Sequence, residues 1–359
     1  MRWSIALGTV GLALIASARS GQAQSAAGRA NTASTAITAT TATTDRMNRM
    51  IPLIEQGLPI LGLNNPPYAA GRGGGGRGRG AATGAPPAVT PPVATEPPPP
   101  PDINAAARET VGYTLGDYVL NTYSPATAEQ YRAFMTAIVA AGGSARTHPF
   151  VAKIPIMHGN VASTTQRLIE QLNDGQVKVE MQQVETTEEI DQTVAGMRFT
   201  SKGGNRPESG FERAAAYWGM TPAQYLQKAD VWPLNKNGEL LVGIIVESRE
   251  GVANARALAA HPGVAVVTVG AGTLGGVFTS TNAEGQRVRD QAGFDAAAAA
   301  VLAACKEYKK SCGYPANNPA EVEKLMKDGW DFLIMQRRDQ AAFDAVLTGR
   351  RLSGRPLTP

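Results

Sequence analysis

The stretch GELLVGIIVESREGVANARALAAHPGVAVVTVGAGTLGG, Gly238–Gly276, decides the fold. It begins with an unbroken apolar run, residues 240–246, which is too short for a good helix and rich in β-branched residues. Such a run predicts a strand that is covered on both faces. Apolar residues then recur at helical spacing from Val252 until His261-Pro262-Gly263 ends the helix. A second apolar run, residues 264–269, predicts another strand, so the stretch indicates a strand, a helix and a strand.

Two parallel strands joined by a helix form a right-handed unit, and ligands of such sheets bind at the carboxyl ends of the strands. Glu247 directly follows the first of these strands. Thr273 lies in the glycine-rich segment, residues 270–276, that follows the second strand. Both residues are therefore candidates for a functional site.

The same alternation of short apolar runs and helical patterns continues along the chain. Further strands are expected at residues 59–63, 117–120, 150–155, 177–182 and 330–336. Helices are expected at residues 131–138, 186–197, 217–228, 292–310, 318–329 and 339–347. About eight strands alternating with helices predict an α/β fold, the TIM (β/α)8 barrel.

One expected strand has an unusual pattern for a buried parallel sheet. Residues 177–182 alternate apolar and polar side chains, with Lys178, Glu180 and Gln182 on one side. These polar side chains need polar surroundings, for which the barrel interior is a candidate.

The N-terminus has the order of a secretory signal peptide. Residues 1–23 carry Arg2, an apolar run that is too short to cross a bilayer, and small residues near a cleavage point at Ala23. An uncleaved membrane anchor is the alternative, and no later stretch is apolar enough to span a membrane. Residues 24–44, rich in Ala and Thr, are interpreted as a disordered tether. We therefore expect an exported protein, periplasmic or extracellular.

A low-complexity segment divides the predicted barrel. Residues 45–65 contain its first helix and strand, residues 66–103 form a long, disordered insertion rich in Gly, Arg and Pro, and residues 104–352 supply the remainder. The Arg-Gly part of the insertion resembles RNA-binding tracts, but it holds only Arg72, Arg77 and Arg79. The net charge of +4 is also too small for a nucleic-acid footprint, so no nucleic-acid partner is expected.

The two cysteines, Cys305 and Cys312, leave two alternatives open. On one continuous helix they would lie about 10 Å apart, too far for a disulfide. A helix that breaks between residues 311 and 315 would allow them to pair. Metal binding by this pair alone is not expected, because no second cluster of Cys or His accompanies it.

Several sequence blocks resemble the HpcH/HpaI aldolase and citrate lyase β-subunit-like family. They occur in the family's order between residues 48 and 352: Gln56-Gly57-Leu58-Pro59-Ile60-Leu61-Gly62, Val184-Glu185-Thr186-Thr187-Glu188-Glu189, Met197-Arg198-Phe199 leading to Gly204-Asn205-Arg206, Val246-Glu247-Ser248, Gly263-Val264 and Gly270 to Leu274. The resemblance implies a barrel aldolase for small 2-oxo acids, in which a divalent ion, Mg²⁺ or Mn²⁺, grips pyruvate as its enolate. It also implies a possible homo-oligomer formed through C-terminal helices, here residues 339–347.

The resemblance implies the following roles. Glu247 matches the first metal-binding carboxylate, and Thr273 stands in place of the second. Apart from the resemblance, Glu180 is a candidate for a lost oxygen ligand if residues 177–182 turn their polar face toward the site. Lys153 matches the arginine that binds the substrate carboxylate, while Arg206, Gly272 and Thr273 are further substrate-binding candidates. Catalytic candidates are Lys153, Tyr123 and Ser124.

The chain departs from the family pattern at the site. Ile245 stands where the family has a glutamine, and Asn121, Tyr123 and Ser124 align with the segment that bears the catalytic base. Two hypotheses follow. The first is a divergent aldolase-like lyase that cleaves or forms a carbon–carbon bond in a 2-oxo acid. The second is a secreted, non-catalytic protein that binds a small acid on a degenerate barrel.

Some candidate residues also have simpler explanations. A buried glutamate such as Glu247 is commonly paired with a lysine away from any chemistry. A Schiff base at Lys153 would need a lowered lysine pKa, for which the sequence gives no sign. The sequence lacks the spacings of serine hydrolases, zinc peptidases and P-loop proteins, which excludes those classes.

Overall fold

The computed structural model describes residues 46–68, 101–121 and 123–358. The expected signal peptide, the expected tether and most of the expected insertion lie outside these residues. No helix in the described part of the chain is long and apolar enough to cross a membrane.

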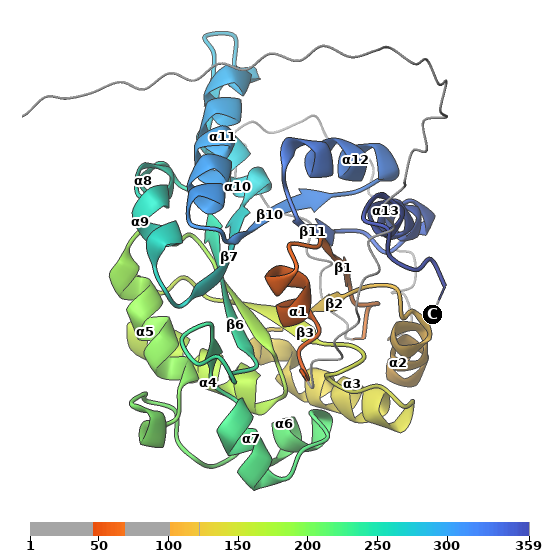
Figure 1. Ribbon diagram of the computed structural model, residues 1–359. Coiled ribbons are helices and arrows are strands. Elements are labelled where there is room, and N and C mark those ends of the chain that lie inside the picture. Colours follow the sequence, from red (N-terminus) through yellow and green to blue (C-terminus); the bar gives the residue numbers. More distant parts are fainter. Residues whose placement is uncertain (1–45, 69–100, 122, 359) are drawn as a thin grey trace, which may run out of the picture. The chain divides into compact units, whose positions relative to one another are not determined.

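Eight parallel strands form a closed ring, which confirms the predicted α/β barrel (Figure 1). Neighbouring strands pair in the order β1, β2, β3, β4, β6, β7, β10 and β11, and β11 pairs with β1. The seam between β4 and β6 has Glu180 opposite Gly243. The strands are β1 (Ile60–Asn64), β2 (Tyr118–Asn121), β3 (Phe150–Ile154), β4 (Lys178–Met181), β6 (Leu240–Val246), β7 (Val264–Val269), β10 (Ser311–Ala316) and β11 (Phe332–Met335). A two-residue strand, β5 (Val231–Trp232), pairs with β6 outside the ring.

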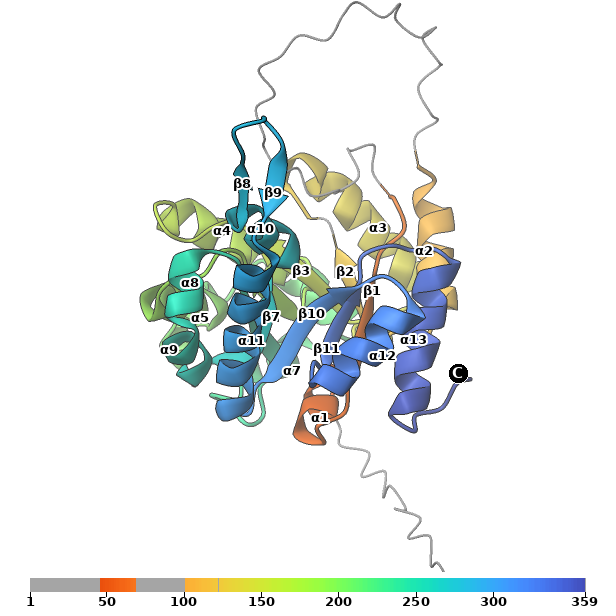
Figure 2. The same ribbon diagram turned by 90° about the horizontal axis from the view of Figure 1, so that it is seen from above.

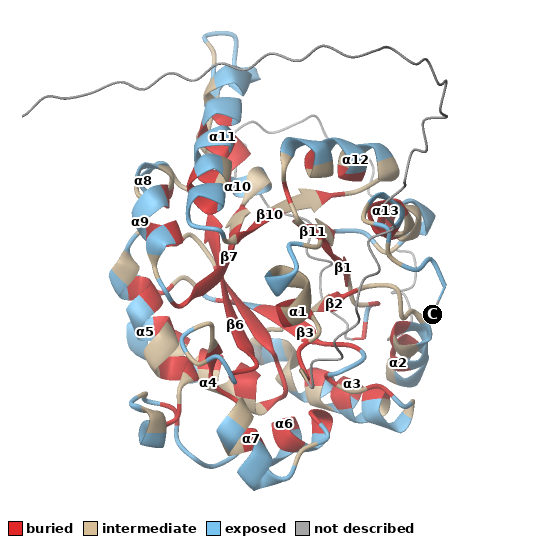
Figure 3. Cartoon of the chain, viewed as in Figure 1, coloured by how far each residue is buried: buried red, intermediate tan, exposed pale blue. Residues whose placement is uncertain are grey.

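Helices surround this ring and have their exposed faces on the outside (Figure 3). They are α1 (Met50–Glu55), α2 (Ile103–Gly112), α3 (Ala128–Ala140), α4 (Val161–Asn173), α5 (Thr187–Met197), α6 (Glu212–Tyr217), α7 (Pro222–Lys228), α8 (Arg249–Ala253), α9 (Ala255–Ala260), α10 (Ala271–Val277), α11 (Gln291–Glu307), α12 (Pro319–Asp328) and α13 (Gln340–Leu352). Short 3-10 turns lie at Pro125–Thr127 and Thr200–Lys202, and a hairpin is formed by β8 (Thr279–Thr281) and β9 (Arg287–Arg289).

Side-chain caps fix where several helices begin. The Thr186 side chain accepts a hydrogen bond from the backbone N–H of Glu189, and the Glu189 carboxylate accepts one from the Thr186 N–H, which forms a capping box at the start of α5. Asn318 caps α12 in front of a first-turn proline, and Gly329 ends that helix with φ 103°. Both helix starts agree with the sequence prediction.

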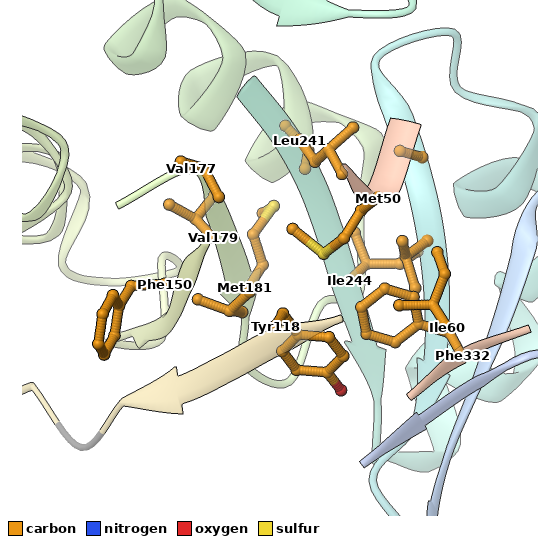
Figure 4. Close-up of a cluster of buried hydrophobic side chains, with 14 of the residues drawn as sticks. Met50, Ile60, Tyr118, Phe150, Val177, Val179, Met181, Leu241, Ile244 and Phe332 are labelled. Atoms are coloured by element: carbon orange, nitrogen blue, oxygen red, sulfur yellow. The ribbon is translucent and has the colours of Figure 1, made fainter. Parts of the chain in front are cut away.

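The first helix closes the end of the barrel where the strands begin. Figure 2 shows α1 on the side opposite α10 and the β8–β9 hairpin. Asn48 just before α1 donates from its side chain to the Glu239 carbonyl, while the Glu239 carboxylate accepts from the Asn48 N–H. Buried side chains from α1 and from β1, β2, β4, β6 and β11 gather in one cluster (Figure 4). With this end closed and filled, the carboxyl ends of the strands remain as the open end.

Three local predictions need correction. Residues 311–315 were expected at most to break a helix, but Ser311–Ala316 is β10, a full barrel strand. The single helix expected over residues 217–228 is two helices, α6 and α7, separated at Gly219, whose φ is +67°. The glycine-rich segment after β7, expected as a turn, is the short helix α10.

Strand β10 also settles the question of the cysteines. Because α11 ends at Glu307, Cys312 lies on a strand and returns toward Cys305. The two residues are joined by a disulfide with Cα atoms 5.8 Å apart, and both are fully buried. The bond ties the last turn of α11 to the start of β10.

Reduction of this disulfide should destabilise the fold. A bond that closes so short a loop removes conformational entropy from the unfolded chain worth about 2–3 kcal/mol. We expect a reductant to lower the free energy of unfolding by that amount in urea denaturation followed by circular dichroism. The double variant Cys305→Ala/Cys312→Ala is the control and should not respond to reductant. An unchanged urea midpoint for the native protein under reductant would contradict the prediction.

Candidate functional site

A cavity of about 460 Å³ opens at the carboxyl ends of the barrel strands. Residues from the ends of β2, β3, β4, β6, β7, β10 and β11 line it, together with α10. This is the position where TIM barrels carry their functional sites. Its volume suits a small organic molecule.

Five of the sequence-predicted site residues line this cavity. They are Lys153, Glu180, Glu247, Gly272 and Thr273. They come from four separate parts of the chain, and closure of the barrel brings them to one opening. The cavity wall therefore contains one lysine and two glutamates among the described residues.

Glu247 follows β6 immediately and is 9% exposed. Its Oε1 accepts a hydrogen bond from the backbone N–H of Gln183 at 3.1 Å. A Cβ atom at Gly270 would collide with Glu247 Oε2, so the glycine leaves room for the carboxylate beside β7. The expected ordinary explanation, a lysine partner for Glu247, does not hold: no ion pair to Glu247 occurs within residues 46–68, 101–121 and 123–358.

Lys153 lies at the end of β3 with its side chain exposed to the cavity. Its backbone carbonyl accepts a hydrogen bond from Gln171, but its ammonium forms no ion pair with any described carboxylate. An exposed ammonium at a cavity mouth is suited to meet an anionic ligand group as a point charge.

Glu180 reaches the cavity from β4 and is held by Lys178. The Lys178 ammonium donates to Glu180 Oε1, and it also lies 4.7 Å from the centre of the Phe332 ring. Lys178 is fully buried, and burial lowers the pKa of its ammonium although the adjacent Glu180 carboxylate opposes this. The alternating polar pattern of this strand thus follows from an ion pair inside the barrel.

Two glycines, on strands that do not pair with each other, make room for side chains in the barrel interior. A Cβ at Gly243 of β6 would collide with Lys178 Nζ and would lie 2.7 Å from Glu180 Oε2. A Cβ at Gly62 of β1 would collide with the ring of Tyr118, which also lines the cavity. Burial and then the Glu180 charge raise the pKa of the Tyr118 phenol well above its usual value, so Tyr118 is a neutral hydrogen-bonding group.

The remaining predicted site residues are not in the cavity wall. The Tyr123 hydroxyl donates to Asp174 Oδ2 at 3.2 Å, and burial followed by the Asp174 charge raises the pKa of that phenol. The Ser124 hydroxyl lies 2.9 Å from Thr127 Oγ1 in a local turn. Arg206 is fully buried, where it donates to Asn173 and to the Tyr225 hydroxyl. These contacts hold the Tyr123 and Ser124 hydroxyls and two of the three Arg206 nitrogens, while Arg206 Nη1 has no hydrogen-bond partner among the described residues.

Sequence reasoning missed several residues of the wall. Tyr118, Thr268, Phe332 and Gln336 line the cavity although they were not candidates. Thr268 and Gln336 lie at or near strand ends, so their position along the strands was the available signal. None of the three histidines lines the cavity; His158, for example, is 2.8 Å from Glu189 Oε1.

The donor set offers little to a resident metal ion. The described residues include no group of three His, Cys, Asp or Glu side chains placed to hold one. Glu180 is already compensated by Lys178, and the Thr273 hydroxyl carries no charge. Mg²⁺ prefers six oxygen ligands, so Glu247 could hold it only together with oxygens of a bound acid and water.

The Lys178–Glu180 ion pair requires a residue without a side chain at position 243, which can be tested. Gly243→Ala should lower the free energy of unfolding by about 1–3 kcal/mol, because its methyl group has no space beside Lys178. Urea denaturation measures this. Gly272→Ala is the matched control, since a Cβ there meets no atom within 4 Å and alanine favours the helix α10. If the two variants are equally stable, the described packing around the ion pair is wrong.

Comparisons with known proteins agree with the barrel. The family model of HpcH/HpaI aldolase/citrate lyase matches residues 157–333. No curated protein matches the sequence. The structure is similar to that of an HpcH/HpaI aldolase/citrate lyase family protein from Burkholderia cenocepacia J2315, with a TM-score of 0.57, 20% identity, and 85% of this chain and 97% of that chain covered.

Two further structures are similar. The HpcH/HpaI aldolase from Desulfitobacterium hafniense DCB-2 has a TM-score of 0.54 and 14% identity, over 86% of this chain and 99% of that chain. The citrate lyase beta subunit from M. tuberculosis, complexed with oxaloacetate and magnesium, has a TM-score of 0.42 and 14% identity, over 70% of this chain and 94% of that chain. At these identities the likeness concerns the fold.

Proposed function

Since the chain belongs to the HpcH/HpaI aldolase/citrate lyase family, we propose that it binds a small 2-oxo acid in the strand-end cavity and acts on it as a divergent aldolase-like lyase. The observation that carries this proposal is a pair of charged groups that line the cavity and form no ion pair with any described residue: the ammonium of Lys153 and the carboxylate of Glu247. The carboxylate of a 2-oxo acid can pair with the Lys153 ammonium. Oxygens of the same acid can share a bound cation with the Glu247 carboxylate.

Lys153 binds and orients the acid in this proposal. Its ammonium meets the acid's carboxylate at the mouth of the cavity, with a less fixed geometry than an arginine fork would give. Phe332 and Ile334 supply apolar wall for the carbon chain. The neutral Tyr118 phenol adds a hydrogen-bonding group to the wall.

Glu247 is the residue that would hold a divalent cation, Mg²⁺ or Mn²⁺, jointly with the acid. A cation there would supply Lewis-acid stabilisation of charge on the substrate oxygen. Because Glu247 is the one carboxylate in the described cavity wall without an ion-pair partner, cation and acid should bind cooperatively, each poorly without the other.

Calorimetric titration tests this arrangement. Oxalate or pyruvate should bind the native protein measurably only when Mg²⁺ or Mn²⁺ is present, and Glu247→Gln should weaken that binding at least about tenfold, because a neutral amide loses the charge that attracts the cation. Glutamine retains the acceptor for the Gln183 N–H. Glu250→Gln, an exposed position on α8 at the same end of the barrel, is the control and should bind normally.

A second candidate function is supported by the candidate catalytic residues that do not line the described cavity wall. Tyr123, Ser124 and the histidines do not line the cavity within the described residues, which favours a non-catalytic protein that binds a small acid. In that case the acid would bind through Lys153 without any metal dependence, and 4-hydroxy-2-oxo acids would release no pyruvate. Lys153→Met should abolish such binding, with the exposed Lys327→Met as its control. Metal-independent binding would reject the lyase proposal.

We also propose that the protein is exported. The buried Cys305–Cys312 disulfide supports this, because disulfides persist mainly in oxidising compartments. After expression of the full chain in a Gram-negative host, the protein should appear in the periplasmic or external fraction. Mass spectrometry should find it shortened at its N-terminus by about the first 23 residues, the length expected of the signal peptide. A full-length cytoplasmic product would contradict export.

A further inference from the structure

The floor of the cavity holds a carboxylate whose chemistry the proposed function leaves unused. Glu180 lines the cavity, yet it is only 6% exposed. One of its oxygens, Oε1, is bonded to Lys178. The other, Oε2, is buried and has no hydrogen-bond partner in the described part of the chain.

An unpartnered buried carboxylate oxygen is unfavourable for stability. Burying a charged group without satisfying it costs free energy, and hydrophobic side chains of similar volume would usually fill a barrel interior as stably. Here β4 carries Lys178 and Glu180, and the facing strand β6 carries a glycine at position 243. Positions 178, 180 and 243 together thus accommodate the Glu180 carboxylate at the cavity.

We propose that Glu180 is the general base and acid of this site, with Lys178 as its positioning residue. Among the described residues, Glu180 and Glu247 are the two carboxylates that line the cavity. With Glu247 committed to the cation, Glu180 is the group that remains for proton transfer. Asn121, Tyr123 and Ser124, which align with the segment that would otherwise carry a base, are not part of the wall.

The proton transfer can be written for a bound 2-oxo acid. The Glu180 carboxylate accepts the proton from C3, the C3–H bond breaks, and its electron pair forms the C2–C3 double bond while the charge moves to the C2 oxygen. In the reverse step the Glu180 carboxyl returns a proton to C3 and the ketone is restored. No oxidant or further reactant is needed. Lys178 stays protonated throughout and holds the carboxylate in place.

This inference rests on the proposed binding of an oxo acid, but its test is separate. In D₂O with Mg²⁺, the methyl protons of pyruvate should exchange for deuterium in the presence of the native protein, as followed by ¹H NMR. This reaction reports proton transfer at C3 and requires no knowledge of the second product. Calorimetry on the same samples reports whether pyruvate is bound.

The decisive variant is the double replacement Lys178→Met/Glu180→Gln, which removes both charges and leaves no uncompensated lysine in the interior. We expect it to bind pyruvate as the native protein does and to exchange its protons about 10²–10⁴-fold more slowly, the usual contribution of a general base. The control variant Glu250→Gln should exchange at the native rate.

Lys178→Met alone separates positioning from a merely structural role. The Glu180 carboxylate would then lack the ammonium that holds it in place, so the exchange rate at saturating pyruvate should fall while the affinity for pyruvate stays native. A merely structural role would instead weaken pyruvate binding and exchange together.

Three results would overturn the inference: no exchange by a native protein that binds pyruvate, native exchange by the double variant, or a parallel loss of pyruvate binding and exchange in Lys178→Met. Failure of pyruvate or oxalate to bind at all would instead reject the proposed function.

Discussion

The interior of the closed barrel must be filled, and at the seam between β4 and β6 it is filled by an ion pair. Glu180 lies opposite Gly243 across this seam, and Lys178 occupies the space that the glycine leaves. A bulkier residue on β6 would displace the ammonium, while an unpaired lysine would be a buried charge without compensation. The packing that closes the ring at this seam therefore requires the ion pair that also places a charge at the cavity.

That requirement separates the two glutamates of the cavity. Glu180 forms an ion pair with Lys178, which lies two residues earlier on β4, so its charge is already balanced before any ligand enters. Glu247 accepts a hydrogen bond from the Gln183 N–H and has no ion-pair partner among the described residues. Two carboxylates at one opening thus have different surroundings, which is the condition under which acidic residues take separate chemical roles.

The sequence predicted the barrel well because its signal is periodic. The apolar runs of β6 and β7 and the caps at Thr186 and Asn318 are local features. Strand β10 was missed because SCGYPA contains a glycine and a proline, which indicate a turn. In the structure Gly313 is needed because a Cβ there would collide with Thr268 of the neighbouring β7. A contact between residues of two strands cannot be recognised from the local sequence pattern of either strand.

The sequence predicted the site residues whose side-chain direction follows from their position on a strand. It did not predict those whose side-chain direction is set by a loop. Lys153, Glu180 and Glu247 reach the cavity from strands or from the residue after one. Tyr123 and Ser124 follow β2 by only a few residues, but their hydroxyls bond to Asp174 and Thr127. Because a carboxylate such as Asp174 binds a phenol more strongly than water does, the helix end that carries Asp174, and not the barrel, determines where Tyr123 points. Chemistry based on strand residues is therefore the part of this site that the fold itself enforces.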